Sequence, residues 1–127
     1  EIAADDFFVG MYTTALQEGE LITAVRFPIP RKASYQKFRQ GASRFALVGV
    51  FVAQTASGVR VAVTGAASSL FRQSALEAAL NQSFTAASAA AVKVDASDLG
   101  SDIHASPVYR AQLISVLTQR AVKQMLG

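Results

Sequence analysis

Residues 34–53, SYQKFRQGASRFALVGVFVA, are the most informative stretch of this chain. The first half of the stretch is basic and polar, and it leads into a short turn at residues 41–44. Charge stops at Arg44, and residues 45–53 carry no polar side chain. A run that is apolar on both faces is typical of a central, covered strand. We therefore expect a cationic turn at the mouth of a buried strand, where a ligand could bind.

Four segments in the first half of the chain have the composition of β-strands. The predicted strands are residues 21–27, 34–40, 45–54 and 59–63. The first ends at Pro28, because proline cannot donate a hydrogen bond to a strand ladder. In the second, side chains two residues apart share a face, so Tyr35, Lys37 and Arg39 lie together. The short connections between consecutive strands predict an antiparallel meander.

The second half of the chain changes to a helical period. The predicted helices are residues 72–80, residues 86–94 and a last helix from residue 107. Leu76 and Leu80 have the spacing of one helix face, and Thr85 is a suitable cap for the second helix. Ser106 followed by Pro107 predicts the last helix start, since proline is favoured at the first helical position. The order predicts an α+β fold: an antiparallel sheet of three to four strands followed by three helices packed on one face.

Several single residues carry expectations about packing. We expect the rings of Phe7 and Phe8 to pack onto the core. In the last helix, Tyr109 lies on the apolar stripe and should face the core, whereas Arg110 should bond the preceding loop through Asp102. That loop also holds the one histidine, His104, for which we expect a surface or helix-entry role.

Composition excludes several classes of function. The 127 residues are 51% hydrophobic and 17% charged, which fits one globular domain. The absence of cysteine excludes disulfides, thiolate nucleophiles and iron–sulfur ligation within this chain. A single histidine leaves no zinc cluster and no nucleophilic triad, so we predict no catalytic and no metal-binding residue. No apolar stretch is long enough to cross a bilayer and no secretory signal is present, so we expect a cytoplasmic location without membrane insertion.

Charge is distributed unevenly along the chain. Residues 1–30 hold five acidic residues against one base, whereas residues 31–60 hold six bases and no acid. A basic block of this kind attracts phosphate or another anion. Its bases are spaced along strands and turns instead of clustering, so we do not expect nucleic-acid binding. A stand-alone interaction module that binds an acidic partner through a basic sheet face is one functional hypothesis.

Three motifs, in this order, resemble the medium, FAD-binding subunit of molybdenum hydroxylases, of the carbon monoxide dehydrogenase and xanthine dehydrogenase type. They are DDFFVGMYTTALQEGELITAVRFPIP at residues 5–30, KFRQGASRFALVGVFVA at residues 37–53 and SDIHASPVYRAQLISVLTQRAV at residues 101–122. The resemblance covers the whole chain but only the C-terminal part of such a subunit. It implies that residues 1–16 are the tail of the upstream FAD-binding domain and residues 17–127 the flavoprotein C-terminal domain.

The resemblance implies an electron-transfer function within an FAD-dependent oxidoreductase. In the family, electrons pass from a molybdenum cofactor on a large subunit through iron–sulfur clusters on a small subunit to FAD, and then to an external acceptor. FAD is bound mainly by two glycine-rich loops of the upstream domain, and this chain contains neither. The isolated fragment should therefore be inactive. The substrate and the electron acceptor of the parent enzyme stay open.

The resemblance also implies cofactor-binding residues. In the family, the turn before the apolar strand approaches the flavin ring, which carries over to Phe45 with Arg44 beside it. The family often has aspartate where this sequence has Arg44. Lys37 lies on the strand that leads into the turn, and a cation there could stabilise negative charge on the reduced ring. Without the resemblance, Phe45 at the start of a buried strand is interpreted as a core residue.

Overall fold

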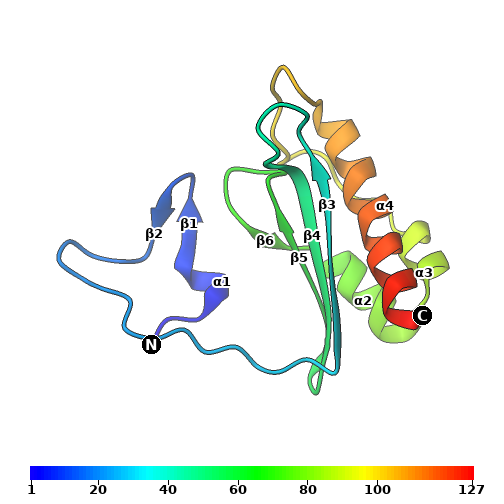
Figure 1. Ribbon diagram of the computed structural model, residues 1–127, viewed down its shortest axis with the longest axis horizontal. Helices are drawn as coiled ribbons and strands as arrows, with labels where there is room; N and C mark the ends of the chain where they lie inside the picture. The colour runs from blue at the N-terminus through cyan, green and yellow to red at the C-terminus, as the bar shows by residue number, and fades with distance from the viewer.

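The computed structural model describes residues 1–127 and shows a packed body with an extended N-terminal arm (Figure 1). We call residues 1–31 the arm and residues 32–127 the body. The body contains β3 (Lys32–Arg39), β4 (Ala46–Thr55), β5 (Gly58–Thr64), β6 (Phe71–Arg72), α2 (Ser74–Gln82), α3 (Ala86–Ala91) and α4 (Pro107–Leu126). The arm contains only α1 (Ala4–Phe7), β1 (Phe8–Gly10) and β2 (Thr13–Thr14). Regular structure is therefore concentrated in the body.

The body is built on one antiparallel sheet of four strands in the order β3-β4-β5-β6. The long apolar run forms β4, which lies between β3 and β5 as its composition predicts. A two-residue loop joins β4 to β5, with Thr55 opposite Gly58. The predicted meander is confirmed for these three strands, and the fourth strand is the short β6.

The predicted strand at residues 21–27 is wrong, because this segment has no regular structure. None of residues 21–30 donates or accepts a backbone–backbone hydrogen bond. The chain first joins the sheet at Arg31, whose N–H donates to the Gln54 carbonyl at 2.7 Å. The β-forming side chains are present, but no neighbouring strand in this chain supplies the ladder that a strand requires.

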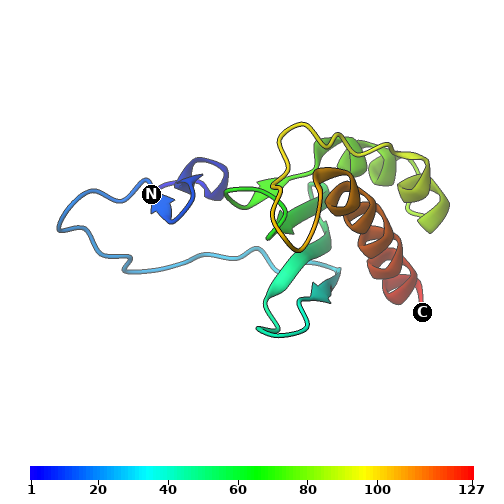
Figure 2. The same cartoon turned by 90° about the horizontal axis from the view of Figure 1, so that it is seen from above.

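All three helices of the body cover one face of the sheet, as Figures 1 and 2 show. Val48, Val50 and Val52 of β4 are fully buried beneath them, with Ile114 and Leu117 of α4. The helix caps follow the sequence prediction: Thr85 Oγ1 accepts from the Ser88 N–H at 3.1 Å, and Ser106 Oγ from the Tyr109 N–H at 3.3 Å. No helix combines the length and apolar character needed to cross a membrane. The predicted α+β fold is confirmed.

The first turn of α4 corrects the expectation for Tyr109. Tyr109 is 43% exposed, and its ring packs edge-to-face on Phe38 of β3 with centroids 6.2 Å apart. Arg110 takes the buried position instead. At the N-terminal end of α4 the buried position is therefore residue 110 and not residue 109. Arg110 can be buried there because its guanidinium donates hydrogen bonds to acceptors inside the body. The lower part of the stripe, including Leu113 and Ala121, is buried as predicted.

The arm corrects the expectation for Phe7 and Phe8. Their rings pack on each other edge-to-face, with centroids 5.2 Å apart, and neither belongs to the hydrophobic core. A single side-chain hydrogen bond joins the arm to the body: Arg72 Nη1 donates to Asp5 Oδ2 at 2.8 Å. The arm therefore lies beside the body without sharing its core, on the side of the sheet opposite the helices (Figures 1 and 2).

Candidate functional site

The turn between β3 and β4, residues 40–45, is closed by its own hydrogen bonds. The Gln40 N–H donates to the Phe45 carbonyl at 2.9 Å, and the Arg44 N–H donates to the Gln40 carbonyl at 3.0 Å. The Gln40 side chain accepts from the Ser43 N–H at 3.2 Å. Arg44 adopts a left-handed backbone conformation with φ of 60°, which residues other than glycine seldom adopt. These contacts predefine the shape of the turn.

Phe45 lies at the surface of this turn, with 78% of the residue exposed. The interpretation of Phe45 as a core residue is therefore wrong. The strand begins one residue later, at Ala46, and the pairing of β3 with β4 shifts register between Phe38 and Arg39. That irregularity leaves Phe45 outside the inward–outward alternation of β4. The result is an exposed aromatic ring at the mouth of a buried strand.

Lys37 lies on the face of β3 that points away from the helices. Ser34 and Gln36 on the same strand bond Gln124 of α4, so the alternate residues Tyr35 and Lys37 occupy the open face. Lys37 pairs across the sheet with Gly49. It forms no ion pair, and neither does Arg44. The structure brings Arg44 and Phe45 together in the turn, whereas no hydrogen bond joins Lys37 to either of them.

The loop before α4 supports the turn from the side. Gln40 Nε2 donates to His104 Nε2 across 2.7 Å, so His104 links the two loops. Asp102 Oδ1 accepts from the N–H groups of His104 at 2.9 Å and Ala105 at 3.0 Å. These backbone hydrogen bonds, and then Arg110, lower the pKa of Asp102 below its usual value. The sequence predicts a surface or helix-entry role for His104 but not its contact with Gln40, because no local pattern relates the two loops.

Arg110 connects this loop to the sheet from a buried position, with only 4% of the residue exposed. Its Nη1 donates to the Leu47 carbonyl at 3.0 Å and to the Gly65 carbonyl at 2.8 Å. Its Nη2 donates to Asp102 Oδ2 at 2.7 Å, which confirms the predicted pair. Because Leu47 lies two residues after Phe45, this arginine braces the base of the turn.

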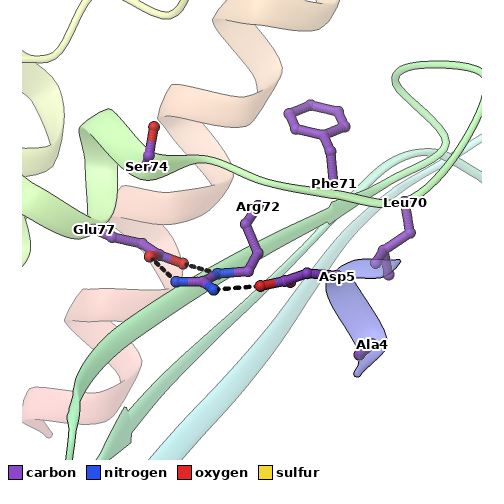
Figure 3. Close-up of a pocket in the computed structure, with 7 residues that line it drawn as sticks. All are labelled: Ala4, Asp5, Leu70, Phe71, Arg72, Ser74 and Glu77. Carbon is purple, nitrogen blue, oxygen red and sulfur yellow. Dashed lines mark hydrogen bonds and ion pairs between the residues drawn. The ribbon is translucent and has the colours of Figure 1, made fainter. Parts of the chain in front are cut away.

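A second polar cluster lies beside a hollow of about 400 Å³ at the edge of the sheet (Figure 3). Glu77 of α2 is 6% exposed and accepts from Arg72 Nε at 2.9 Å and Arg72 Nη2 at 2.6 Å. The Val61 N–H also donates to it at 2.9 Å. Burial by itself would raise the pKa of Glu77, but the bonds from Arg72 and Val61 outweigh it and lower that pKa. A carboxylate held in this way is a poor proton acceptor, so the cluster is structural.

No group of three or more histidine, aspartate or glutamate side chains is placed to hold a metal ion. The buried carboxylate of Glu77 already accepts three hydrogen bonds, from Arg72 and Val61. The remaining candidate is the turn at residues 40–45, which offers an exposed ring and a braced backbone, with the three cations Lys37, Arg39 and Arg44 nearby in sequence. Such an arrangement can contact a planar or anionic group but carries no acid–base pair.

No family model matches the chain, but curated relatives do. The nicotine 6-hydroxylase medium subunit of Paenarthrobacter nicotinovorans is 36% identical over 134 residues, covering 95% of this chain and 46% of that protein. The carbon monoxide dehydrogenase medium chain of Afipia carboxidovorans is 37% identical over 60 residues, covering 45% of this chain and 21% of that protein. The chain thus spans less than half the length of these curated relatives. Both are medium chains of oxidoreductases.

Solved structures agree with the fold. Quinoline 2-oxidoreductase from Pseudomonas putida 86 superposes with a TM-score of 0.79 and 25% identity, covering 98% of this chain and 47% of that one. Reconstituted CO dehydrogenase from Oligotropha carboxidovorans gives a TM-score of 0.76, 24% identity and coverage of 98% and 48%. The second likeness shows the fold alone. Together with the curated relatives, the solved structures confirm the predicted resemblance to the medium subunits of molybdenum hydroxylases.

Proposed function

We propose that this chain, as a relative of the medium subunits of molybdenum hydroxylases, is the C-terminal domain of an FAD-containing subunit. The observation that carries the proposal is the 36% identity to a medium subunit over 95% of this chain. In this proposal the turn at residues 40–45 closes one side of the flavin site. Bound FAD would accept electrons from iron–sulfur clusters and pass them to an external acceptor.

The residues of the turn fit a flavin ring. The Phe45 ring is exposed and apolar, and the flat face of an aromatic side chain packs well on a planar heterocycle. Arg44 and Lys37 are cations without an ionic partner in the chain, and reduced flavin gains negative charge. These three residues would contact or face the ring, and none of them would act as acid, base or nucleophile.

The braced backbone would contribute orientation and exclusion of water. The hydrogen bonds of Gln40 close the turn on itself, and the bond to His104 ties it to the loop before α4. A preformed turn can present Phe45 to the ring without a further ordering cost. The phosphates of FAD would be held elsewhere, in the upstream domain of which residues 1–16 would form the tail, because this chain has no glycine-rich phosphate loop.

The proposal includes two partner subunits, a large one with the molybdenum cofactor and a small one with the iron–sulfur clusters. The relatives support this assignment because they are named as medium chains, which implies a larger and a smaller companion. The turn at residues 40–45 would not determine which large and small subunits bind. The substrate would be chosen by the large subunit.

The experiment compares Phe45→Ala with Phe38→Ala in the complete subunit, assembled with its partners. Phe38 is the matched control, because its ring packs on Tyr109 on the helix side of the sheet. We expect Phe45→Ala to shift the flavin absorbance and reduction potential while leaving the unfolding free energy within about 0.5 kcal/mol, as is usual at exposed positions. Phe38→Ala should leave the flavin spectrum unchanged. An unchanged spectrum and potential in Phe45→Ala would remove Phe45 from the site.

A titration of residues 1–127 with FAD tests the division between the two domains. We expect no tight, stoichiometric binding, because the phosphate loops lie outside this chain. Stoichiometric binding by the fragment alone would contradict the proposed division, whatever the effect of Phe45→Ala.

A further inference from the structure

The segment at residues 21–30 contains a strand by composition, residues 21–27, that has no partner in this chain. Its side chains are typical of strands, yet none of its backbone groups bonds another backbone group. Backbone N–H and C=O groups that are not satisfied within a fold are satisfied by water or by another polypeptide. The strand preference and the observed structure therefore disagree over the seven residues 21–27.

The apolar side chains of this segment are also uncovered. Five large ones are between 55% and 94% exposed. They are Leu21, Ile22, Val25, Phe27 and Ile29. As an extended strand, the segment would place Leu21, Thr23, Val25 and Phe27 on one side and Ile22, Ala24 and Arg26 on the other. The first side is the more apolar, and it has no cover in the body.

The rest of the arm lacks cover in the same way. The small sheet of β1 and β2 contains only five residues, and a lone two-stranded ribbon of that size is marginal in water. Val9 of β1, and Met11 and Tyr12 of the connection to β2, are each more than half exposed. The arm projects from the side of the main sheet that faces away from the helices, as Figures 1 and 2 show. Residues 8–14 and residues 21–30 are therefore neighbouring parts of one arm, and both have uncovered apolar side chains.

We propose that residues 21–27 form a β-strand by pairing with the polypeptide that makes up the other half of medium subunits, with the side of Val25 packed inward. This inference rests on the proposed function, because the partner is the upstream FAD-binding domain. The quinoline 2-oxidoreductase chain that covers 98% of this chain is itself only 47% covered, so a subunit of this kind carries as much polypeptide again. The whole arm would then belong to the upstream domain, which moves the domain boundary from residue 16 to residue 31.

Amide hydrogen exchange in the complete subunit tests the pairing. We expect the amides of residues 22–27 to exchange at least about a hundredfold more slowly in the complete subunit than in the 127-residue fragment, since a paired strand opens only by local unfolding. The amides of β4 and β5 are the internal control, because they pair within this chain and should be protected in both. Equally fast exchange of residues 22–27 in both proteins would overturn the proposal.

Two substitutions at adjacent positions test which side faces inward. Val25→Glu places a charge on the side proposed to be buried, and Ala24→Glu places the same charge on the opposite side. We expect Val25→Glu to abolish the slow exchange of residues 22–27 in the complete subunit and Ala24→Glu to preserve it, with β4 and β5 protected in both. Equal effects of the two variants would contradict the proposed orientation.

Two further measurements separate the possible failures. If residues 22–27 exchange slowly in the 127-residue fragment, and their protection increases with protein concentration, the partner is a second copy of the chain. That result would overturn the inference. Flavin retained by a complete subunit with fast exchange at residues 22–27 would reject the inference and leave the proposed function standing. Slow exchange at residues 22–27 in a complete subunit that holds no flavin would support the inference and reject the proposed function.

Discussion

At the scale of single residues, Arg44 and Phe45 show how one backbone angle places a side chain. The left-handed angle at Arg44 costs roughly 1–2 kcal/mol for a residue with a Cβ. The hydrogen bonds between Gln40, Arg44 and Phe45 offset part of this cost. Because the chain reverses at Arg44, Phe45 stays outside the strand and exposed. Hydrophobicity alone predicts the opposite location for this ring.

Glu77→Gln should destabilise the body at neutral pH by roughly 1–3 kcal/mol, the range for losing a charged hydrogen-bond partner. The loss should fall in the lower part of that range, because the partner Arg72 is 36% exposed and water can replace part of the bond. Urea denaturation measures the change. Glu18→Gln, at an exposed position of the arm, is the control and should have no effect.

The same pair of proteins should show a defined pH dependence. The pKa of Glu77 is lower in the folded state than its unfolded value of about 4.3. The stabilisation is therefore fully present above that unfolded value and is lost as the pH falls through the folded pKa. We expect the difference between wild type and Glu77→Gln to be constant from about pH 5.5 to 7 and to shrink below about pH 4.3. A difference that grows on acidification would contradict this sign.

Gly65→Ala should be more disruptive than Gly19→Ala, although both glycines have positive φ, 75° and 81°. A Cβ on Gly65 would collide with the Ala46 carbonyl and lie 3.0 Å from the Leu47 carbonyl, whereas nothing lies within 4 Å at Gly19. We expect Gly19→Ala to cost about 1 kcal/mol for the backbone angle, and Gly65→Ala to cost roughly 2–4 kcal/mol. Thermal or urea unfolding compares the two. Similar losses would show that the β4 backbone moves aside freely.

At the scale of elements, α4 is attached to the sheet by Arg110 as well as by its apolar stripe. Arg110→Met would keep much of the buried volume but leave the Leu47 and Gly65 carbonyls without this donor. We expect a loss of roughly 2–4 kcal/mol in unfolding free energy. Arg120→Met, at an exposed position of the same helix, is the control and should change stability by less than about 0.5 kcal/mol. Equal effects would assign Arg110 a surface role.

The elements differ in how well the sequence predicts them. The last helix follows directly from the Ser106-Pro107 start and the apolar period, and β4 from its unbroken apolar run. The two-residue strand β6 carries too little pattern to be recognised, since it is defined only by its pairing with β5. The strand prediction for residues 21–27 fails for the opposite reason, because the strand pattern is strong but no strand in this chain pairs with it.

At the scale of the whole molecule, the body should be stable without the arm. No residue of the arm belongs to the hydrophobic core, and the bond between Asp5 and Arg72 is partly exposed. We expect residues 32–127 to unfold within about 1 kcal/mol of residues 1–127, because exposed ion pairs contribute little. Urea denaturation of the two fragments makes the comparison. A loss of several kcal/mol on removing the arm would show that it packs on the body more tightly than its exposure indicates.

The residues alone predict the α+β order of the elements, the central position of β4, the caps of α3 and α4 and the family resemblance. These follow from local periodicity and from residue types whose preferences act within a few positions. Four features become visible only in the folded chain: Phe45 is exposed, Arg110 is buried in place of Tyr109, Gln40 bonds His104, and residues 21–27 have no strand partner. The positions of Arg110 and Gln40 depend on groups brought together from distant parts of the chain, and such contacts leave no local pattern to recognise. The exposure of Phe45 follows from the turn geometry at Arg44, and residues 21–27 stay irregular because no strand of this chain pairs with them.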